Sequence, residues 1–235
     1  CPAGRDELQP LIPLVRTGSG RVELRTDGTR AVVCAERPIE GIEHLAVDGR
    51  AVAGDPTLEL TVLGRELRVS PRSFFQANLE VNEQLVQAVV DAMGSCEQVL
   101  DLCAGIGNFS VPMARDRRVI AVELEGQATA DLAHNAAANG VDIQVHTGRV
   151  ERFDPTRVAF DGVVLDPPRA GCKGVVEKLV LQRPRRLAYV SCYLPSAVRD
   201  LKAAVEAGYH LDEVVIFDMF PDTHHVETLL LLSRG

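Results

Sequence analysis

From about residue 77 onward, short apolar strands alternate with helical segments, and this alternation constrains the fold more than any other feature. Buried strands are predicted for five apolar runs, at 98–102, 119–124, 143–147, 162–168 and 187–192. Helices are predicted between several of them, at 127–140, 174–182 and 196–208. Repeated strand–helix units with buried strands form a parallel sheet that helices cover on both faces. Right-handed crossovers then give an α/β fold with a doubly wound, Rossmann-like sheet.

Other segments frame this pattern at both ends. The segment 77–94 carries apolar residues at helical spacing and ends in Gly94, which predicts a helix before the first strand. A further helix is expected to begin in 109–116. The last two apolar runs, 213–220 and 227–233, have no helix between them. They predict an antiparallel hairpin at one edge of the sheet.

The first 70 residues have a different texture. Apolar and polar residues alternate there in three extended pieces, 20–26, 30–36 and 58–70. Asp27-Gly28 is a tight-turn signal, because glycine readily takes the positive φ that such turns need. We therefore expect a small β-rich module over 1–70 and an α/β domain over 71–235.

The charge balance is acidic and limits the choice of partners. The 235 residues include 33 Asp and Glu against 25 Lys and Arg, for a net charge of −8. Nucleic-acid-binding domains usually have a basic excess, so an RNA contact must come from local groups such as the arginines within 115–118 and 183–186. A membrane span and a signal peptide are not expected, because no apolar run is long enough and the start lacks a leader pattern.

The cysteines indicate a reducing compartment. All 6 are scattered, without a C-x-x-C pair or a histidine at metal-ligand spacing. We therefore expect a cytoplasmic protein in which most thiols are buried and inert.

In doubly wound sheets, ligands bind beyond the carboxyl ends of the strands. After the first strand, the turn DLCAGIGNFS supplies a carboxylate, two glycines and an amide: Asp101, Gly105, Gly107 and Asn108. The next strand ends in Glu123, where a carboxylate typically accepts hydrogen bonds from a ribose diol. The pattern is shared by nucleotide-type cofactor sites in general, and a tight turn that only packs strand on helix is the alternative. Ser110 replaces the third glycine of the dinucleotide fingerprint, which weakens the case for NAD.

Later strand ends add a carboxylate and a thiol. Asp166 opens DPPRAG, in which two prolines stiffen the loop, and the alternative is a purely structural corner. Cys192 ends the strand before the helix 196–208, where the positive end of the helix dipole favours a thiolate. Cys103 and Cys172 also follow strands, so position alone does not single out Cys192.

A run of polar residues precedes the last strand. His224, His225 and Glu227 follow one another closely enough to suggest metal binding. Adjacent side chains on a strand point to opposite faces, however, so we expect a solvated or hydrogen-bonded cluster and no metal site.

Five segments together resemble the RNA (uracil-5-)-methyltransferases, enzymes that make 5-methyluridine in transfer or ribosomal RNA from S-adenosylmethionine. They occur in the family's order and spacing over about two-thirds of the chain: SPRSFFQANLEVNEQL, DLCAGIGNFSVPMA, VVLDPPRAG, YVSCYLPSAVRDL and DMFPDTHHVETLLLLSR. The resemblance implies a class I methyltransferase fold for the sheet. It also implies a monomeric enzyme of RNA modification with S-adenosylmethionine as cofactor.

The resemblance also assigns roles to residues. It implies that Cys192 is the nucleophile that adds to carbon 6 of uracil, which makes carbon 5 reactive toward the methyl group. Glu227 would be the base that removes the carbon 5 proton. The same match places the cofactor against Gln76, Asp101, Cys103, Gly105, Gly107, Asn108, Glu123 and Asp166. Phe74 and Asp166 would face the base, which must be flipped out of its stack. An Asp166 carboxylate would accept the N3 hydrogen of uracil and leave cytosine without a partner.

Some positions depart from the family's pattern. Tyr193 follows Cys192 where the family has Asn, Cys103 replaces a common aromatic residue, and Gly148 replaces a polar residue near the adenine. Cys1-Pro2 resembles the last of four cysteine ligands of an iron–sulfur cluster in the ribosomal subgroup. The other three ligands have no counterpart in this sequence, so no cluster is expected here. We expect a shortened or naturally short member in which the RNA-binding barrel is absent and 1–70 is the central module.

Two other functions stay open at this point. A cytosine-5 RNA methyltransferase also uses a cysteine adduct, although its Pro-Cys loop after the fourth strand is replaced here by DPPRAG. A truncated, non-catalytic module that binds cofactor or RNA would form no adduct. The choice between transfer and ribosomal RNA also stays open.

Overall fold

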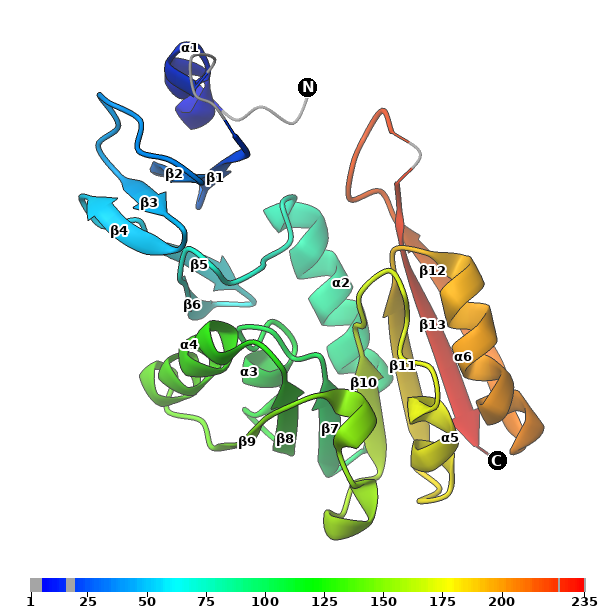
Figure 1. Ribbon diagram of the computed structural model, residues 1–235. Coiled ribbons are helices and arrows are strands. Elements are labelled where there is room, and N and C mark those ends of the chain that lie inside the picture. Colours follow the sequence, from blue (N-terminus) through cyan, green and yellow to red (C-terminus); the bar gives the residue numbers. More distant parts are fainter. Residues whose placement is uncertain (1–5, 16–19, 224, 235) are drawn as a thin grey trace.

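The computed structural model describes residues 6–15, 20–223 and 225–234, and its centre is a seven-stranded sheet between two helical layers (Figure 1). The strand order is β12-β13-β11-β10-β7-β8-β9. Five strands run parallel: β7 (Gln98–Leu102), β8 (Arg118–Glu123), β9 (Ile143–Thr147), β10 (Gly162–Leu165) and β11 (Arg186–Ser191). The predicted doubly wound α/β fold is thus confirmed.

The last two strands close one edge of the sheet. Strand β13 (Glu227–Arg234) pairs antiparallel with β11, and β12 (Tyr209–Phe217) pairs antiparallel with β13. The predicted edge hairpin is confirmed. It places the first residue of β13, Glu227, opposite the carboxyl end of β11, because Thr228 pairs with Ser191.

The two faces of the sheet are covered by different helices. On one face lie α2 (Leu79–Ala92), α3 (Ser110–Met113) and α4 (Gly126–Ala138), and on the other lie α5 (Val175–Val180) and α6 (Leu194–Glu206). Along β7 the side chains alternate accordingly, since Val99 packs with the first group and Leu100 with the second. Helix α3 is only four residues long, shorter than the segment 109–116 suggests. Among the described residues, no helix combines the length and the apolar composition needed to cross a bilayer.

Short helical turns complete the described elements. They are η1 (Asp6–Leu11) and α1 (Ile12–Val15) near the start, and η2 (Val150–Arg152) and η3 (Pro155–Arg157) between β9 and β10. In η3, the Asp154 side chain accepts a hydrogen bond from the backbone of Thr156 and so caps the turn.

The N-terminal region is β-rich, as predicted. A four-stranded sheet in the order β1-β2-β3-β4 contains β1 (Val22–Thr26), β2 (Ala31–Ala35), β3 (Leu45–Val47) and β4 (Arg50–Ala53). The predicted turn joins β1 to β2, with Gly28 at a φ of 93°. The sequence pattern missed β3 and β4, because they are short and β4 is mostly exposed, so their residues do not alternate clearly.

The expected single extended piece 58–70 is wrong, because the chain reverses in its middle. It forms a hairpin of β5 (Leu58–Val62) and β6 (Arg65–Val69), with Leu63 and Gly64 at φ values of 49° and 70°. The buried side chains of the hairpin share one apolar core with α2 and α4. Figure 1 shows β1 to β4 beside the large sheet and far from β12. The hairpin of β5 and β6 precedes residue 70 but packs with helices of the large sheet. The boundary at residue 70 stays a prediction.

Candidate active site

The site lies where the connections of the sheet reverse direction. Strands β7 and β10 are neighbours, and from them the chain continues outward in opposite directions, through β8 and through β11. Such a switch point leaves a crevice beyond the carboxyl ends of the strands. A cavity of about 560 Å³ opens there. Its lining includes most of the residues predicted for the site: Phe74, Gln76, Cys103, Gly105, Asn108, Glu123, Asp166, Cys192 and Glu227.

Glu123 organises one side of the cavity. Its Oε2 accepts a hydrogen bond of 2.8 Å from the backbone of Gly105, in the turn after β7. Its Oε1 accepts bonds of 2.7 and 2.8 Å from the backbones of Leu124 and Glu125. The carboxylate at the end of β8 thus fixes the glycine turn at the end of β7, and it faces the cavity.

Asn108 is held by a partner that the sequence reasoning missed. Its side-chain amide and that of Asn82, on α2, exchange two hydrogen bonds of 2.9 Å each. Both residues line the cavity. Asn82 is buried on a helix whose other buried residues are apolar, and a polar residue on the apolar face of the predicted helix is the signal that could have found it.

Two predicted cofactor residues, Asp101 and Gly107, lie behind the cavity wall. Asp101 is fully buried, and its Oδ2 accepts a bond of 2.5 Å from the Ser110 hydroxyl. No hydrogen-bond partner for its Oδ1 occurs within the described part of the chain. Burial raises the pKa of this carboxyl to about 7. Gly107 has a φ of 94° and packs against Val111 of α3.

Replacing Gly107 by Ala is expected to lower the free energy of unfolding by about 1–3 kcal/mol, because it combines backbone strain with a clash. A Cβ there would lie 2.9 Å from Cγ2 of Val111. Gly140 is a matched control, with a φ of 64° and nothing within 4 Å of its Cβ position, so Gly140→Ala measures the backbone strain alone. Urea unfolding of both variants checks this. A Gly140→Ala variant as unstable as Gly107→Ala would contradict the clash.

The predicted nucleophile, base and recognition residue line the same cavity. Cys192 is exposed at the end of β11, Glu227 is buried at the start of β13, and Asp166 is half-buried after β10. Burial, together with the charges of Glu227 and Asp101, raises the pKa of Asp166 to about 8. Burial raises the pKa of Glu227 to about 7. Two carboxyls with raised pKa values in one cavity are suited to proton transfer near neutral pH.

The expectation that the helix dipole favours a Cys192 thiolate does not hold in the protein alone. Partial burial raises the pKa of the Cys192 thiol, and the nearby Glu227 carboxylate raises it further. Arg169 acts in the opposite direction but more weakly. The thiol therefore needs a base or an added positive charge before it can act as a nucleophile.

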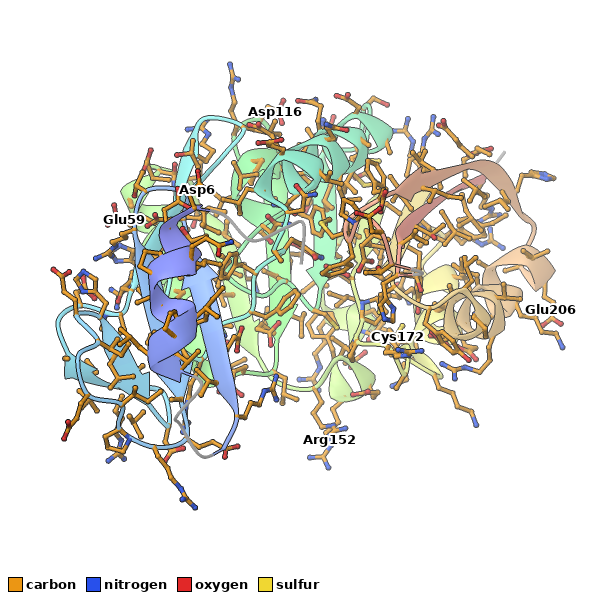
Figure 2. The ribbon with its side chains drawn as sticks, turned by 90° about the horizontal axis from the view of Figure 1, so that it is seen from above. Asp6, Glu59, Asp116, Arg152, Cys172 and Glu206 are labelled. Carbon is orange, nitrogen blue, oxygen red and sulfur yellow. The ribbon has the colours of Figure 1, made fainter. Side chains whose placement is uncertain are left out.

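The two other thiols near the site are less suited to that role. Burial raises the pKa of Cys172 to about 12, and its Sγ lies 4.0 Å from the Tyr189 hydroxyl. Cys172 lies on the side of α5 and α6 (Figure 2). Burial and the Glu123 carboxylate also raise the pKa of Cys103. Of these three cysteines, Cys192 alone is exposed, which position in the sequence did not reveal.

The three carboxyls with raised pKa values predict a stability that falls as pH rises. Asp101, Asp166 and Glu227 have pKa values of about 7, 8 and 7, all above those of unfolded carboxyls. Each therefore contributes full stability below pH 4, and this contribution is lost between about pH 4 and its folded pKa. The loss is at most about 1.4 kcal/mol per pH unit for each group. Urea unfolding at pH 5 and pH 8 checks this. Glu227→Gln should show a smaller loss than the wild type, and an equal loss would contradict the raised pKa.

The rim of the cavity carries aromatic and basic side chains. The Phe74 side chain is 70% exposed. Arg72 and Arg149 line the cavity. Outside its lining, the Arg169 guanidinium carbon lies 4.9 Å from the centre of the Tyr193 ring. Tyr193 occupies the N-cap position of α6, and its side chain makes no capping hydrogen bond.

The basic groups singled out in the sequence lie elsewhere. Arg118 begins β8 and Arg186 begins β11, so both mark the amino ends of strands, on the opposite edge of the sheet from the cavity. Arg152, which belongs to neither of these two groups, also extends into solvent at the molecular surface (Figure 2). The arginines at the rim were not predicted, because no charge run marks them.

Two sequence expectations fall wholly or partly on residues that the structure does not describe. His224 of the predicted polar cluster, and Cys1 with Pro2, lie outside the described residues. Within 6–15, 20–223 and 225–234, no group of three or more His, Cys, Asp or Glu side chains is arranged to hold a metal ion.

Gly148, which replaces a polar residue of the family's pattern, lies beside Glu123. The Gly148 backbone nitrogen donates a hydrogen bond to the Glu123 carbonyl. A Cβ at Gly148 would meet nothing within 4 Å, so the glycine leaves open space there.

Comparison with known proteins finds relatives of the chain. The family model described as tRNA (uracil-5-)-methyltransferase matches residues 56–235. The protein of Klebsiella pneumoniae named 23S rRNA (uracil(1939)-C(5))-methyltransferase RlmD is 37% identical over 179 residues, which cover 73% of this chain and 41% of that protein. The protein of the same name from Yersinia enterocolitica is 34% identical over 100% of this chain and 61% of its own length. The chain thus spans about two-fifths to three-fifths of these relatives.

Solved structures show the same fold. The tRNA (uracil-54, C5)-methyltransferase of Pyrococcus abyssi, solved with S-adenosyl-L-homocysteine, superposes with a TM-score of 0.78 at 25% identity, over 93% of this chain and 61% of that one. The Methanocaldococcus jannaschii protein Trm5, solved with adenosine, superposes with a TM-score of 0.64 at 14% identity, over 98% of this chain and 78% of that one. The second likeness concerns the fold alone.

Proposed function

Because the chain belongs to the tRNA (uracil-5-)-methyltransferase family, we propose that it transfers a methyl group from S-adenosylmethionine to carbon 5 of a uridine in RNA. The observation that carries the proposal is one cavity that holds an exposed thiol and two carboxyls of raised pKa, Cys192, Asp166 and Glu227. The enzyme would act as a monomer on cytoplasmic RNA. The sequence relatives are named for 23S rRNA, whereas the family model and the Pyrococcus abyssi structure are named for tRNA, so both RNAs are candidate substrates.

The residues of the cavity fit the cofactor. Gly105 has a φ of 56° and open space at its Cβ position, so a ligand can approach the backbone closely. After its three backbone bonds, the Glu123 carboxylate has one lone-pair site left, on Oε2, that can accept a hydrogen bond from a ribose hydroxyl. Gln76, Cys103 and Asn108 line the same wall. When bound, S-adenosylmethionine supplies an electrophilic methyl group attached to a positively charged sulfur.

The proposed reaction uses Cys192 and Glu227 in turn. The Cys192 thiolate adds to carbon 6 of uracil, and the electron pair of the 5,6 double bond then becomes available at carbon 5. Carbon 5 forms a bond to the methyl group, and the sulfur–methyl bond breaks. Glu227 next accepts the carbon 5 proton, the double bond re-forms, and the Cys192 thiolate leaves carbon 6. With a pKa of about 7, Glu227 can both take up and release this proton near neutral pH.

Asp166 would select uracil over cytosine. In the protein alone its pKa of about 8 favours the neutral acid, and the positive sulfonium would lower that pKa and favour the carboxylate. A carboxylate accepts the N3 hydrogen of uracil, whereas cytosine presents a lone pair there. Phe74, exposed at the rim, offers a ring on which the flipped base can stack.

Replacing Asp166 by Asn is expected to reduce the preference for uracil by about 5-fold to 100-fold, because an amide can turn either an acceptor or a donor toward N3. The measurement is the ratio of methyl transfer into RNAs whose target position is uridine or cytidine. Asp212→Asn, an exposed change on β12, serves as the control. An unchanged ratio in Asp166→Asn would remove Asp166 from base recognition.

Tritium release tests the proposed function directly. RNA carrying tritium at carbon 5 of uridine is incubated with the chain and S-adenosylmethionine, because methylation at carbon 5 must expel that hydrogen. A large-subunit ribosomal RNA fragment and a transfer RNA are compared as substrates. Release from uridine-labelled RNA is the expected result. Release only from cytidine-labelled RNA would identify a cytosine-5 methyltransferase, and cofactor binding without release would identify a non-catalytic module.

A further inference from the structure

A buried carboxylate on α4 lies outside the cavity and has no part in the chemistry described above. The Asp131 side chain is only 1% exposed. It accepts three hydrogen bonds: 2.8 Å from the Ser70 backbone, 2.7 Å from the Ser70 hydroxyl and 2.6 Å from the Ser73 hydroxyl. Nε of Arg68 lies 3.6 Å from its Oδ1. A buried carboxylate is tolerated when donors surround it in this way, so Asp131 binds the 70–73 segment tightly.

The segment that Asp131 holds carries two residues of the site. Residues 70–78 link β6 to α2 without regular secondary structure, and hydrogen bonds from other segments help to fix their position, among them one of 2.8 Å from the Arg25 side chain to the Ser73 carbonyl. Phe74 directly follows the anchored Ser73, and Gln76 lies two residues further along. Both line the cavity, and Gln76 is buried in its wall. The position of both side chains therefore depends on where Ser73 is held.

One helical turn further along α4, Asn135 links strand β6 to the glycine turn that follows β7. Its side chain accepts a bond of 2.8 Å from the Arg68 backbone nitrogen and donates one of 3.1 Å to the Arg68 carbonyl. It also donates a bond of 2.9 Å to the carbonyl of Ile106. The buried edge of α4 thus contacts both segments that contribute residues to the cavity, the one that leads to Gln76 and the one with Gly105.

The hydrogen-bond directions explain why a carboxylate is needed. The Gln127 amide donates a bond of 3.1 Å to the Ser70 hydroxyl oxygen, so the hydroxyl proton points to Asp131. The Ser70 backbone nitrogen can only donate. An asparagine at 131 has only one side-chain oxygen, so at least one of the three donors from Ser70 and Ser73 would lose its acceptor.

We propose that Asp131 is a positioning residue that fixes the 70–76 segment and thereby sets Gln76 against the cofactor and Phe74 against the base. The inference rests on the proposed function for the identity of the cofactor. It concerns a residue that touches neither ligand and acts through the serines it binds.

A double-mutant cycle on S-adenosylhomocysteine binding tests this role. Calorimetry measures the dissociation constant for the wild type, Asp131→Asn, Gln76→Ala and the double variant, without RNA. We expect Asp131→Asn to raise the dissociation constant by about 10-fold in the wild-type background, which is within the range of coupling between interacting sites. In the Gln76→Ala background, the same substitution should raise the dissociation constant by less than about 2-fold. A residue that only stabilises the fold would give effects that multiply.

Controls keep the outcomes distinct. Asp142→Asn changes an exposed carboxylate just beyond α4 and should leave the dissociation constant unchanged. Ser73→Ala removes one donor and is used in the same cycle if Asp131→Asn does not fold. Full multiplication of the two effects, or unchanged binding in Asp131→Asn, would overturn the proposal. A wild-type chain that does not bind S-adenosylhomocysteine would overturn the proposed function as well, whereas binding without RNA methylation would affect the proposed function alone.

Discussion

Replacing Cys192 by Ala is expected to lower methyl transfer by about 10³-fold or more, the scale on which loss of a covalent nucleophile lowers kcat in other enzymes. Without a thiolate at carbon 6, carbon 5 of uracil remains too weak a nucleophile to take the methyl group. Affinity for S-adenosylhomocysteine should stay within about 2-fold, because the predicted cofactor contacts lie on the other side of the cavity, at Glu123 and Asn108. Single-turnover transfer and calorimetry measure the two quantities.

The control for this variant is a cysteine at the opposite edge of the sheet. Cys96 lies two residues before β7, is buried, and does not line the cavity. Cys96→Ala should retain wild-type turnover. If Cys192→Ala also retains turnover, Cys192 is not the nucleophile, and the exposed position that distinguishes it from Cys103 and Cys172 has no catalytic meaning.

Replacing Glu227 by Gln is expected to trap the reaction after methyl transfer. The amide cannot accept the carbon 5 proton, so turnover should fall by about 10²–10⁴-fold, the usual contribution of a general base. The adduct between Cys192 and the methylated uracil should accumulate, because elimination of the thiolate needs that proton to leave first. Denaturing gel electrophoresis of protein with labelled RNA measures the accumulated complex.

A second carboxylate of the same hairpin provides the control. Glu213 lies on β12 with an exposed side chain and pairs with Leu231 of β13. Glu213→Gln should show neither slow turnover nor trapped complex. A Glu227→Gln variant that loses turnover without accumulating the complex would place Glu227 before adduct formation, for example in removing the proton from Cys192.

The catalytic sheet could be predicted from the sequence because its signals are local. Each strand of the pattern is an apolar run of four to six residues bounded by polar or turn residues, as in GVVL before Asp166. The helices show apolar spacing and clear ends, such as Asn78, which caps α2 by accepting a bond from the Val81 backbone. The direction of the parallel strands then placed Asp166, Cys192 and the glycine turn at one edge.

The N-terminal region was less predictable because its signals depend on distant partners. The reversal at Leu63 and Gly64 is not marked by Asn-Gly or Asp-Gly, and a leucine there adopts a φ that its side chain disfavours. Strands β3 and β4 are short, and only their pairing with β2 and with each other defines them. Alternation within the segment does not contain that information.

The electrostatics of the site could not be derived from sequence either. A strand end followed by a helix favours a thiolate in isolation. Partial burial nevertheless raises the pKa of Cys192, and so does Glu227, which is 35 residues away in the chain. The same holds for Asn82 and Asp131, whose roles follow from contacts with Asn108 and Ser73 across the fold. Family resemblance pointed to the residues that carry the chemistry, whereas the residues that hold them in place emerged only from the packing.

The covalent role of Cys192 is tested most directly by the intact mass of the protein after incubation with S-adenosylmethionine and an RNA that carries 5-fluorouridine at the target position. Fluorine cannot leave carbon 5 as a proton does, so Glu227 cannot complete the last step and the adduct persists. For the wild type we expect a mass equal to protein plus RNA plus one methyl group less the thiol hydrogen, and no such species for Cys192→Ala. A methylated adduct that forms equally in Cys192→Ala, or the absence of any adduct from a wild-type chain that methylates ordinary uridine, would contradict the covalent role of Cys192.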